Sequence, residues 1–160
     1  MQAILKLCVQ VEERVGSIYA ELAQYPSADP ELHTIWQAMA EDEVQHAYRI
    51  RVIADRLHLA GVSELNLDPD LVQSLFDRAG EILQEVQEQS LSVDEAIYAS
   101  VELEDAFMQV HLNYGDAGGQ PDLQTMFRLL AEEDRKHTAQ LKAYLERMPD
   151  GTGLEFTEPD

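Results

Sequence analysis

The sequence predicts an all-α fold: a four-helix bundle with a long crossover between its second and third long helices. Apolar residues recur at the three- and four-residue spacing of a helix through almost the whole chain. No stretch between turn signals alternates with the two-residue period of a strand. Breaks that contain proline or glycine separate four long periodic segments, and the break over residues 62–91 is the longest. Two helical hairpins joined by one crossover fit this order.

The first part of the chain predicts two long helices. We expect a helix over residues 2–24, which ends where two prolines interrupt the helical pattern. The next helix should run over residues 30–60. Asp29 suits its N-cap, Pro30 suits its first position, and Gly61 suits the turn after its end.

The crossover and the remainder of the chain predict three more helical segments. An amphipathic stretch over residues 71–89 should form a short helix within the crossover. Ser92 and Glu95 have the spacing of a capping box, and they start a helix that ends near Gly115. The last helix should run over residues 121–148 and begin at a proline.

The length of 160 residues suits a single domain, which we place at residues 1–148. The remaining residues, 149–160, form an acidic segment that we expect to be a disordered tail. Because Cys8 is the only cysteine, neither a disulfide nor a four-cysteine metal centre can form within one chain.

The charge of the chain argues against two classes of partner. Its formal net charge is -20, from 31 acidic against 11 basic residues, which repels phosphate backbones and anionic membrane surfaces. We therefore expect no nucleic-acid partner and no membrane partner. No segment approaches the roughly 20 apolar residues of a membrane span, and the residues after Met1 lack a signal-peptide pattern. A cytoplasmic location is the expectation.

The chain contains an internal repeat with a period of about 92 residues, the separation of Glu12 and Glu104. Positions seven and three residues before each acid, and three residues after it, are apolar in both copies. The second and fourth long helices match in the same way around Glu43 and Asp134. These offsets stay near one face of a helix, the face that a bundle buries, so the four acids should point inward.

The inward acids require positive charge, because burial of an unpaired carboxylate is costly. The matching stripes contain no lysine or arginine, whereas two divalent cations would offset four carboxylates. A histidine follows two of the acids by three residues, which places an oxygen and an imidazole nitrogen on one helix face. The sequence therefore predicts a dinuclear metal site. Its predicted ligands are Glu12, Glu43, His46, Glu104, Asp134 and His137.

Two other acid and histidine combinations need separate treatment. Asp55 and His58 have the same spacing, but they lie off the apolar stripe and have no counterpart in the repeat, so we expect them at the surface. Glu133, four residues before His137, is an alternative ligand to Asp134. We favour Asp134, because the stripe through Glu133 is less apolar.

The order of these motifs resembles the ferritin-like di-iron carboxylate proteins, in which two helices present a Glu and two others a Glu-x-x-His. Within them the chain is most similar to the rubrerythrin group, over about residues 3–147. The resemblance implies a ferritin-like bundle that binds two iron ions, with manganese or zinc as alternatives. Its specific parts are Glu12 followed by Tyr19, Glu43 followed by His46, the helix start at 92–96 that leads to Glu104, and the run 131–134, an alanine and three acids, before His137.

The resemblance also implies a role for each ligand. Glu12 and Glu104 would be terminal ligands of the two ions. Glu43 and Asp134 would bridge them, and each of the two histidines would bind one ion. Asp134 departs from the family pattern, in which this position is a glutamate. Because aspartate is one methylene shorter, it can bind one ion only or leave room for solvent.

Tyr19 and His111 occupy matching positions of the repeat, seven residues after Glu12 and Glu104. Either side chain could serve catalysis by hydrogen bonding to a metal ligand, and His111 could also shuttle protons. The alternatives are a tyrosine that packs in the core and a buried neutral histidine.

The resemblance implies a rubrerythrin-like enzyme that reduces hydrogen peroxide, or oxidises ferrous iron, at the dinuclear site. The sequence contains no four-cysteine rubredoxin domain, so electrons would come from an external donor, a rubredoxin-like protein or a reductase. The family also implies a homodimer. Two alternatives stay open. Bacterioferritin-like iron oxidation and sequestration is favoured by Val101, which replaces an additional glutamate of many rubrerythrins. The other is a metal-stabilised bundle without catalysis.

Overall fold

The computed structural model describes residues 2–61, 67–116 and 120–148. These residues form five helices and contain no strand, which confirms the all-α prediction. No helix among them is long and apolar enough to cross a membrane. The predicted tail over residues 149–160 lies outside the described ranges. The helices are α1 (Gln2–Leu22), α2 (Pro30–Leu59), α3 (Pro69–Gln87), α4 (Val93–Asp116) and α5 (Pro121–Leu145).

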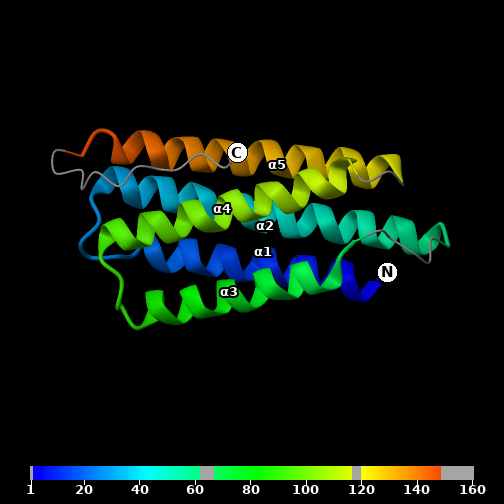
Figure 1. Ribbon diagram of the computed structural model, residues 1–160, viewed down its shortest axis with the longest axis horizontal. Coiled ribbons are helices and arrows are strands. Elements are labelled where there is room, and N and C mark those ends of the chain that lie inside the picture. Colours follow the sequence, from blue (N-terminus) through cyan, green and yellow to red (C-terminus); the bar gives the residue numbers. More distant parts are fainter. Residues whose placement is uncertain (1, 62–66, 117–119, 149–160) are drawn as a thin grey trace.

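The five helices lie roughly side by side in an elongated bundle (Figure 1). The closest pairs are α1 with α2 and α4 with α5, and α2 also contacts α5. The crossover helix α3 returns along the outside of α1, so α2 and α4 run in the same direction (Figure 1). Arg14 on α1 holds α3 in place, because its guanidinium donates to the carbonyl oxygen of Phe76 at 2.8 Å and lies over that ring.

Capping residues explain where the crossover helix differs from its predicted range. It begins at Pro69 rather than at residue 71, because the Asp68 side chain accepts from the backbone N–H of Asp70 at 3.0 Å. It ends at Gln87 rather than at residue 89, because Gln89 has a φ of 50°. This left-handed backbone cannot continue a right-handed helix.

The other helix ends lie near their predicted positions. The α1 and α5 helices end two and three residues early, at Leu22 and Leu145. Asp29 caps α2 as expected, with its carboxylate accepting from the N–H of Leu32 at 2.9 Å. The capping box before α4 is also confirmed, because Glu95 accepts from the Ser92 N–H at 2.8 Å.

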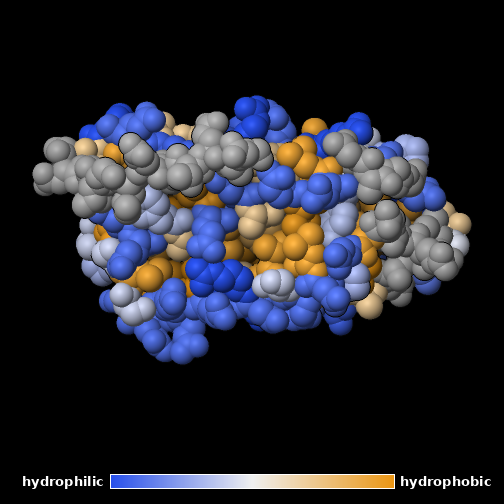
Figure 2. Space-filling model, in the orientation of Figure 1, coloured by the Kyte–Doolittle hydropathy of each residue, from blue (hydrophilic) through white to orange (hydrophobic). Residues whose placement is uncertain are grey.

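An apolar core fills the bundle, and one polar cluster interrupts it near its middle. Trp36 and Phe127 are fully buried, and Trp36 donates to the Ser100 hydroxyl at 3.2 Å. Hydrophilic residues cover much of the face shown in Figure 2, with apolar residues visible between them. The buried acids and histidines of the cluster come from four different helices. Burial of this many ionisable groups requires a function or strong mutual pairing.

Candidate metal centre

All six predicted ligands lie in the interior of the bundle, and none is more than 5% exposed. The α1 and α4 helices each supply one glutamate, and α2 and α5 each supply an acid and a histidine. The acid and the histidine of a pair are three residues apart and share one helix face. The apolar stripe on that face buries them together with the core, as the repeat predicted.

Within the described part of the chain, two groups of these residues could hold a metal ion. We call Glu12, Glu43 and His46 the first triad. His46 Nδ1 lies 3.1 Å from Glu43 Oε2 and 3.6 Å from Glu12 Oε2. These atoms are close enough to one another to bind a single cation.

We call Glu43, Glu104 and His137 the second triad. His137 Nδ1 lies 3.2 Å from Glu104 Oε2 and 3.9 Å from Glu43 Oε1. Glu43 therefore belongs to both triads, with one carboxylate oxygen facing each histidine. A carboxylate in this position can bind two cations at once, one through each oxygen.

Asp134 and Glu133 occupy different places. Asp134 is buried, with Oδ1 4.0 Å from His46 Nδ1 and Oδ2 2.7 Å from His111 Nδ1. The side chain of Glu133 is 30% exposed and lies at the outer edge of the His46 ring, 3.0 Å from Nε2. It also forms an ion pair with Arg49. Asp134 thus faces the interior of the site, and Glu133 contacts the side of His46 that faces away from the first triad.

Tyr19 and His111 both contact predicted ligands. The Tyr19 hydroxyl donates to Glu104 Oε1 at 2.6 Å, which joins α1 to α4. His111 Nε2 lies 3.3 Å from Glu12 Oε1, in addition to its contact with Asp134. Tyr19 in the first copy of the repeat therefore contacts Glu104 in the second copy, and His111 in the second copy contacts Glu12 in the first.

The buried acids raise the pKa values of the three histidines beside them. Burial lowers the pKa of His46, but the hydrogen bonds and charges of Glu12 and Glu43 outweigh burial and raise it to about 12. Burial likewise lowers the pKa of His111, and Asp134 and Glu12 outweigh it and raise the pKa to about 9. The pKa of His137 is also raised, because Glu104 and Asp42 outweigh its burial.

The glutamates respond to burial in two ways. Burial raises the pKa of Glu43 well above its ordinary value, although His46 partly opposes this. Burial also raises the pKa of Glu104. At Glu12 burial acts in the same direction, but hydrogen bonds from His111 and His46 outweigh it and lower the pKa. A cation that binds in this cluster would replace these protons as the balancing charge of the acids.

Asp42 is a candidate site residue that the sequence reasoning missed. Its Oδ2 lies 3.1 Å from Nε2 of His137, as Glu133 lies against Nε2 of His46. The two outer acids precede Glu43 and Asp134 by one residue, so the repeat itself contained the signal. An acid on the outer nitrogen of a metal-binding histidine fixes the tautomer and the orientation of the ring.

We predict that Asp42→Asn and Glu133→Gln each weaken metal binding about 10- to 100-fold, the usual cost of losing such a partner. Competition titration of the ion-free protein with Zn²⁺ and a chromophoric chelator measures this. Asp77→Asn is the control, because Asp77 is an exposed acid on α3 whose contact is Gln73. Equal affinities in all four proteins would exclude a role for the outer acids.

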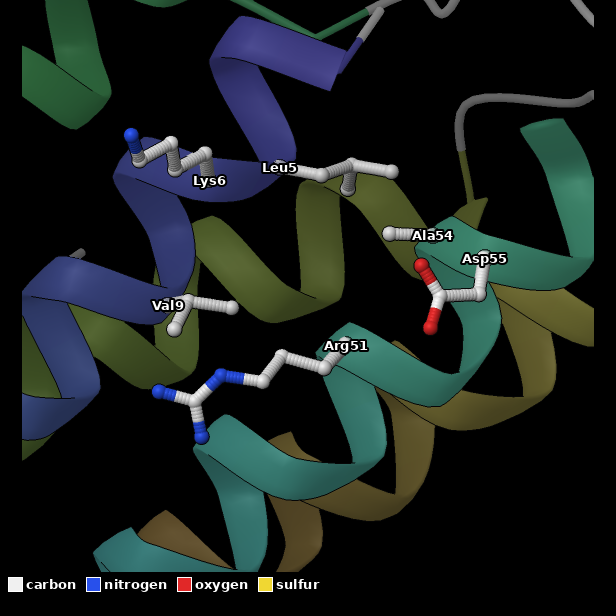
Figure 3. A pocket seen from close by; sticks show the side chains of 6 residues that line it. All are labelled: Leu5, Lys6, Val9, Arg51, Ala54 and Asp55. Carbon is white, nitrogen blue, oxygen red and sulfur yellow. The ribbon is translucent and has the colours of Figure 1, made fainter.

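Two surface depressions lie between α1 and α2. A groove of about 420 Å³ is lined by Glu12 and by small residues that include Gly16 and Ala40. A Cβ atom at Gly16 would lie 3.2 Å from Glu43 Cβ, so glycine lets the two helices approach closely beside the centre. Figure 3 shows the second depression, about 310 Å³, with none of the predicted ligands in its lining. Its lining residues are Leu5, Lys6, Val9, Arg51, Ala54 and Asp55.

Comparisons of the chain with family models, with curated proteins and with solved structures gave no match. The described residues form an all-helical bundle whose buried glutamates and histidines make two groups that could hold a metal ion. Glu43 is common to both groups.

Proposed function

We propose that this protein is a rubrerythrin-like di-iron redox enzyme with a ferritin-like bundle, and that it reduces hydrogen peroxide. The observation that carries the proposal is the position of Glu43, whose two oxygens face the histidines of two buried triads. The direction of the crossover supports a ferritin-like arrangement, because α3 returns along the bundle and leaves α2 and α4 parallel (Figure 1).

The donor atoms suit the proposed metal. Carboxylate and imidazole groups bind iron, manganese and zinc, and a set without thiolate excludes none of these ions. Within the described residues, the four buried acids at the centre, Glu12, Glu43, Glu104 and Asp134, pair with histidines and with Tyr19 rather than with lysine or arginine. Two divalent cations would offset the four carboxylates if the histidines bind as neutral imidazoles.

Two ferrous ions held here would supply the two electrons that, with two protons, convert one hydrogen peroxide molecule to two water molecules. The chain's own residues prepare the site. Glu43 sets the spacing of the two positions, and the Tyr19 hydroxyl orients Glu104 at 2.6 Å. The surrounding apolar core limits access of water.

An external donor would restore the reduced state in this proposal. Cys8 is buried and is the only cysteine in these 160 residues, so they cannot form a four-cysteine rubredoxin-type centre among themselves. We propose a rubredoxin-like protein or a reductase as the donor, a cytoplasmic setting, and a homodimer as the assembly.

The test is an anaerobic titration with ferrous ion, followed by addition of peroxide and absorption spectroscopy. We expect two ferrous ions per chain, and their oxidation by one equivalent of peroxide at least tenfold faster than that of free ferrous ion. His46→Ala should lose the rapid phase, and Asp77→Asn should retain it. Oxidation no faster than that of free ferrous ion would contradict peroxidase activity.

Iron oxidation and sequestration is the second candidate function. Buried Val101 favours it, because this position carries no additional carboxylate on α4. Retention of many more than two irons per chain would support this candidate. A redox-silent protein that binds zinc or manganese tightly would instead support a metal-stabilised bundle without catalysis.

A further inference from the structure

We propose that the two ion positions are unequal: the first triad holds its ion tightly, and the second triad holds a weaker, exchangeable ion. His111 is the positioning residue that creates the difference. The inference deepens the proposed function and rests on its premise that the centre binds two ions. It follows from three contrasts between the two sides of the site.

The first contrast is the number of carboxylates. Asp134 Oδ1 lies 4.0 Å from His46 Nδ1, on the side of the first triad. His111 Nδ1 holds the other oxygen of Asp134 at 2.7 Å, so this oxygen is not free to turn toward the second triad. Each triad contains two acids, and Asp134 lies beside the histidine of the first triad as an additional acid. An additional carboxylate in a buried site attracts a cation strongly.

The second contrast is how firmly the acids are held. Glu12 and Asp134 each present one oxygen to His111 and the other toward His46. The His111 ring is 3% exposed and stacks near Phe107 and Phe127, with centroid distances of 6.2 and 5.5 Å. One rigid imidazole thus orients two acids of the first position before any ion arrives, which lowers the entropic cost of binding.

The third contrast concerns the residue that corresponds to His111 in the repeat. Tyr19 has a single hydroxyl, and it contacts one acid of the second triad, Glu104. The second triad therefore has one acid held in this way, and the additional acid Asp134 lies beside His46 of the first triad instead. Without that additional acid, the second position would leave more coordination positions to water or to a small oxygen ligand such as peroxide.

Anaerobic titration of the ion-free protein with Co²⁺, followed by visible absorption and calorimetry, tests the inference. We expect two binding steps whose affinities differ at least tenfold. His111→Phe should weaken the tighter step about 10- to 100-fold and leave the weaker step unchanged. Asp134→Asn should act in the same direction. His111→Gln, which keeps a hydrogen-bond donor and acceptor, should recover part of the affinity.

Tyr19→Phe is the matched variant on the other side, and it should weaken only the second step. Circular dichroism verifies that each variant is folded. Two equal steps in the unaltered protein, or equal weakening of both steps by His111→Phe and by Asp134→Asn, would overturn the inference while leaving the proposed dinuclear centre intact. An unaltered protein that binds less than one Co²⁺ per chain would overturn both.

Discussion

Glu43→Ala is expected to abolish tight binding of both ions, whereas Glu104→Ala should abolish binding of only one. The reason is that Glu43 belongs to both triads and Glu104 to the second alone. The loss of ion binding should also reduce the stabilisation of the folded protein by the ion. An ion that binds only the folded protein stabilises it by about 4 kcal/mol at a concentration 1,000 times its Kd.

Thermal unfolding with and without Co²⁺ measures this effect. The unaltered protein should show a rise in melting temperature of about 10 °C with the ion, Glu104→Ala a smaller rise, and Glu43→Ala almost none. Glu41→Ala is the control, because Glu41 is an exposed acid on the same helix that accepts from Gln37. If Glu43→Ala retained one tight ion, the shared role of this carboxylate would be wrong.

Metal binding is expected to release protons and to strengthen as the pH rises. A histidine must be neutral to bind a cation, but without an ion the pKa of His46 is about 12 and that of His137 is also raised. Near neutral pH each incoming ion therefore displaces a proton from its histidine. The apparent affinity should rise by up to about tenfold per pH unit for each proton released. Indicator dyes in weakly buffered solution count these protons, and release of none would contradict the prediction.

The ion-free protein should lose stability as the pH rises from 6.5 to about 9. A pKa that is higher in the folded state contributes stability that is complete below the unfolded value and is lost as the pH rises through the folded value. For His111, with an ordinary pKa of 6.5 and a folded pKa of about 9, the loss falls between these values and is on the order of 3 kcal/mol at most.

Two of the glutamates reinforce this trend, because burial raises the pKa of Glu43 and Glu104 and their charged forms are costly. The lowered pKa of Glu12 acts only in acid, below its ordinary value of 4.5. The stabilisation by Co²⁺ should therefore grow between pH 6.5 and 9. Denaturant unfolding at both pH values measures it, and a stabilisation that shrinks with rising pH would refute this account.

The burial of the four acids could be predicted from the sequence. Residues at offsets of three, four and seven share a helix face whatever the neighbouring helices do, so the apolar residues around Glu12 determine which way it points. The caps at Asp29 and Ser92 could be predicted for the same reason, because they depend on residues close in the chain. The exposed position of Asp55 and His58 also follows from the stripe alone.

The partners of the buried groups could not be predicted in this way. The repeat treats Glu43 and Asp134 as equivalents, yet Glu43 reaches both histidines and Asp134 contacts His111. Side-chain length and the offset between neighbouring helices decide which oxygen meets which nitrogen, and neither is visible in a single helix. Asp42 was missed because its partner, His137, lies 95 residues away on another helix.

The sequence by itself therefore determined the class of the fold, the boundaries of its helices to within a few residues, and the set of inward-facing acids and histidines. These features depend on local geometry along one helix. Only the tertiary structure decided that Glu43 is shared by two triads, that Asp134 is held by His111, and that outer acids hold the two histidines. Those contacts join residues of different helices, and they exist only once the packing of the bundle has set the distances between them.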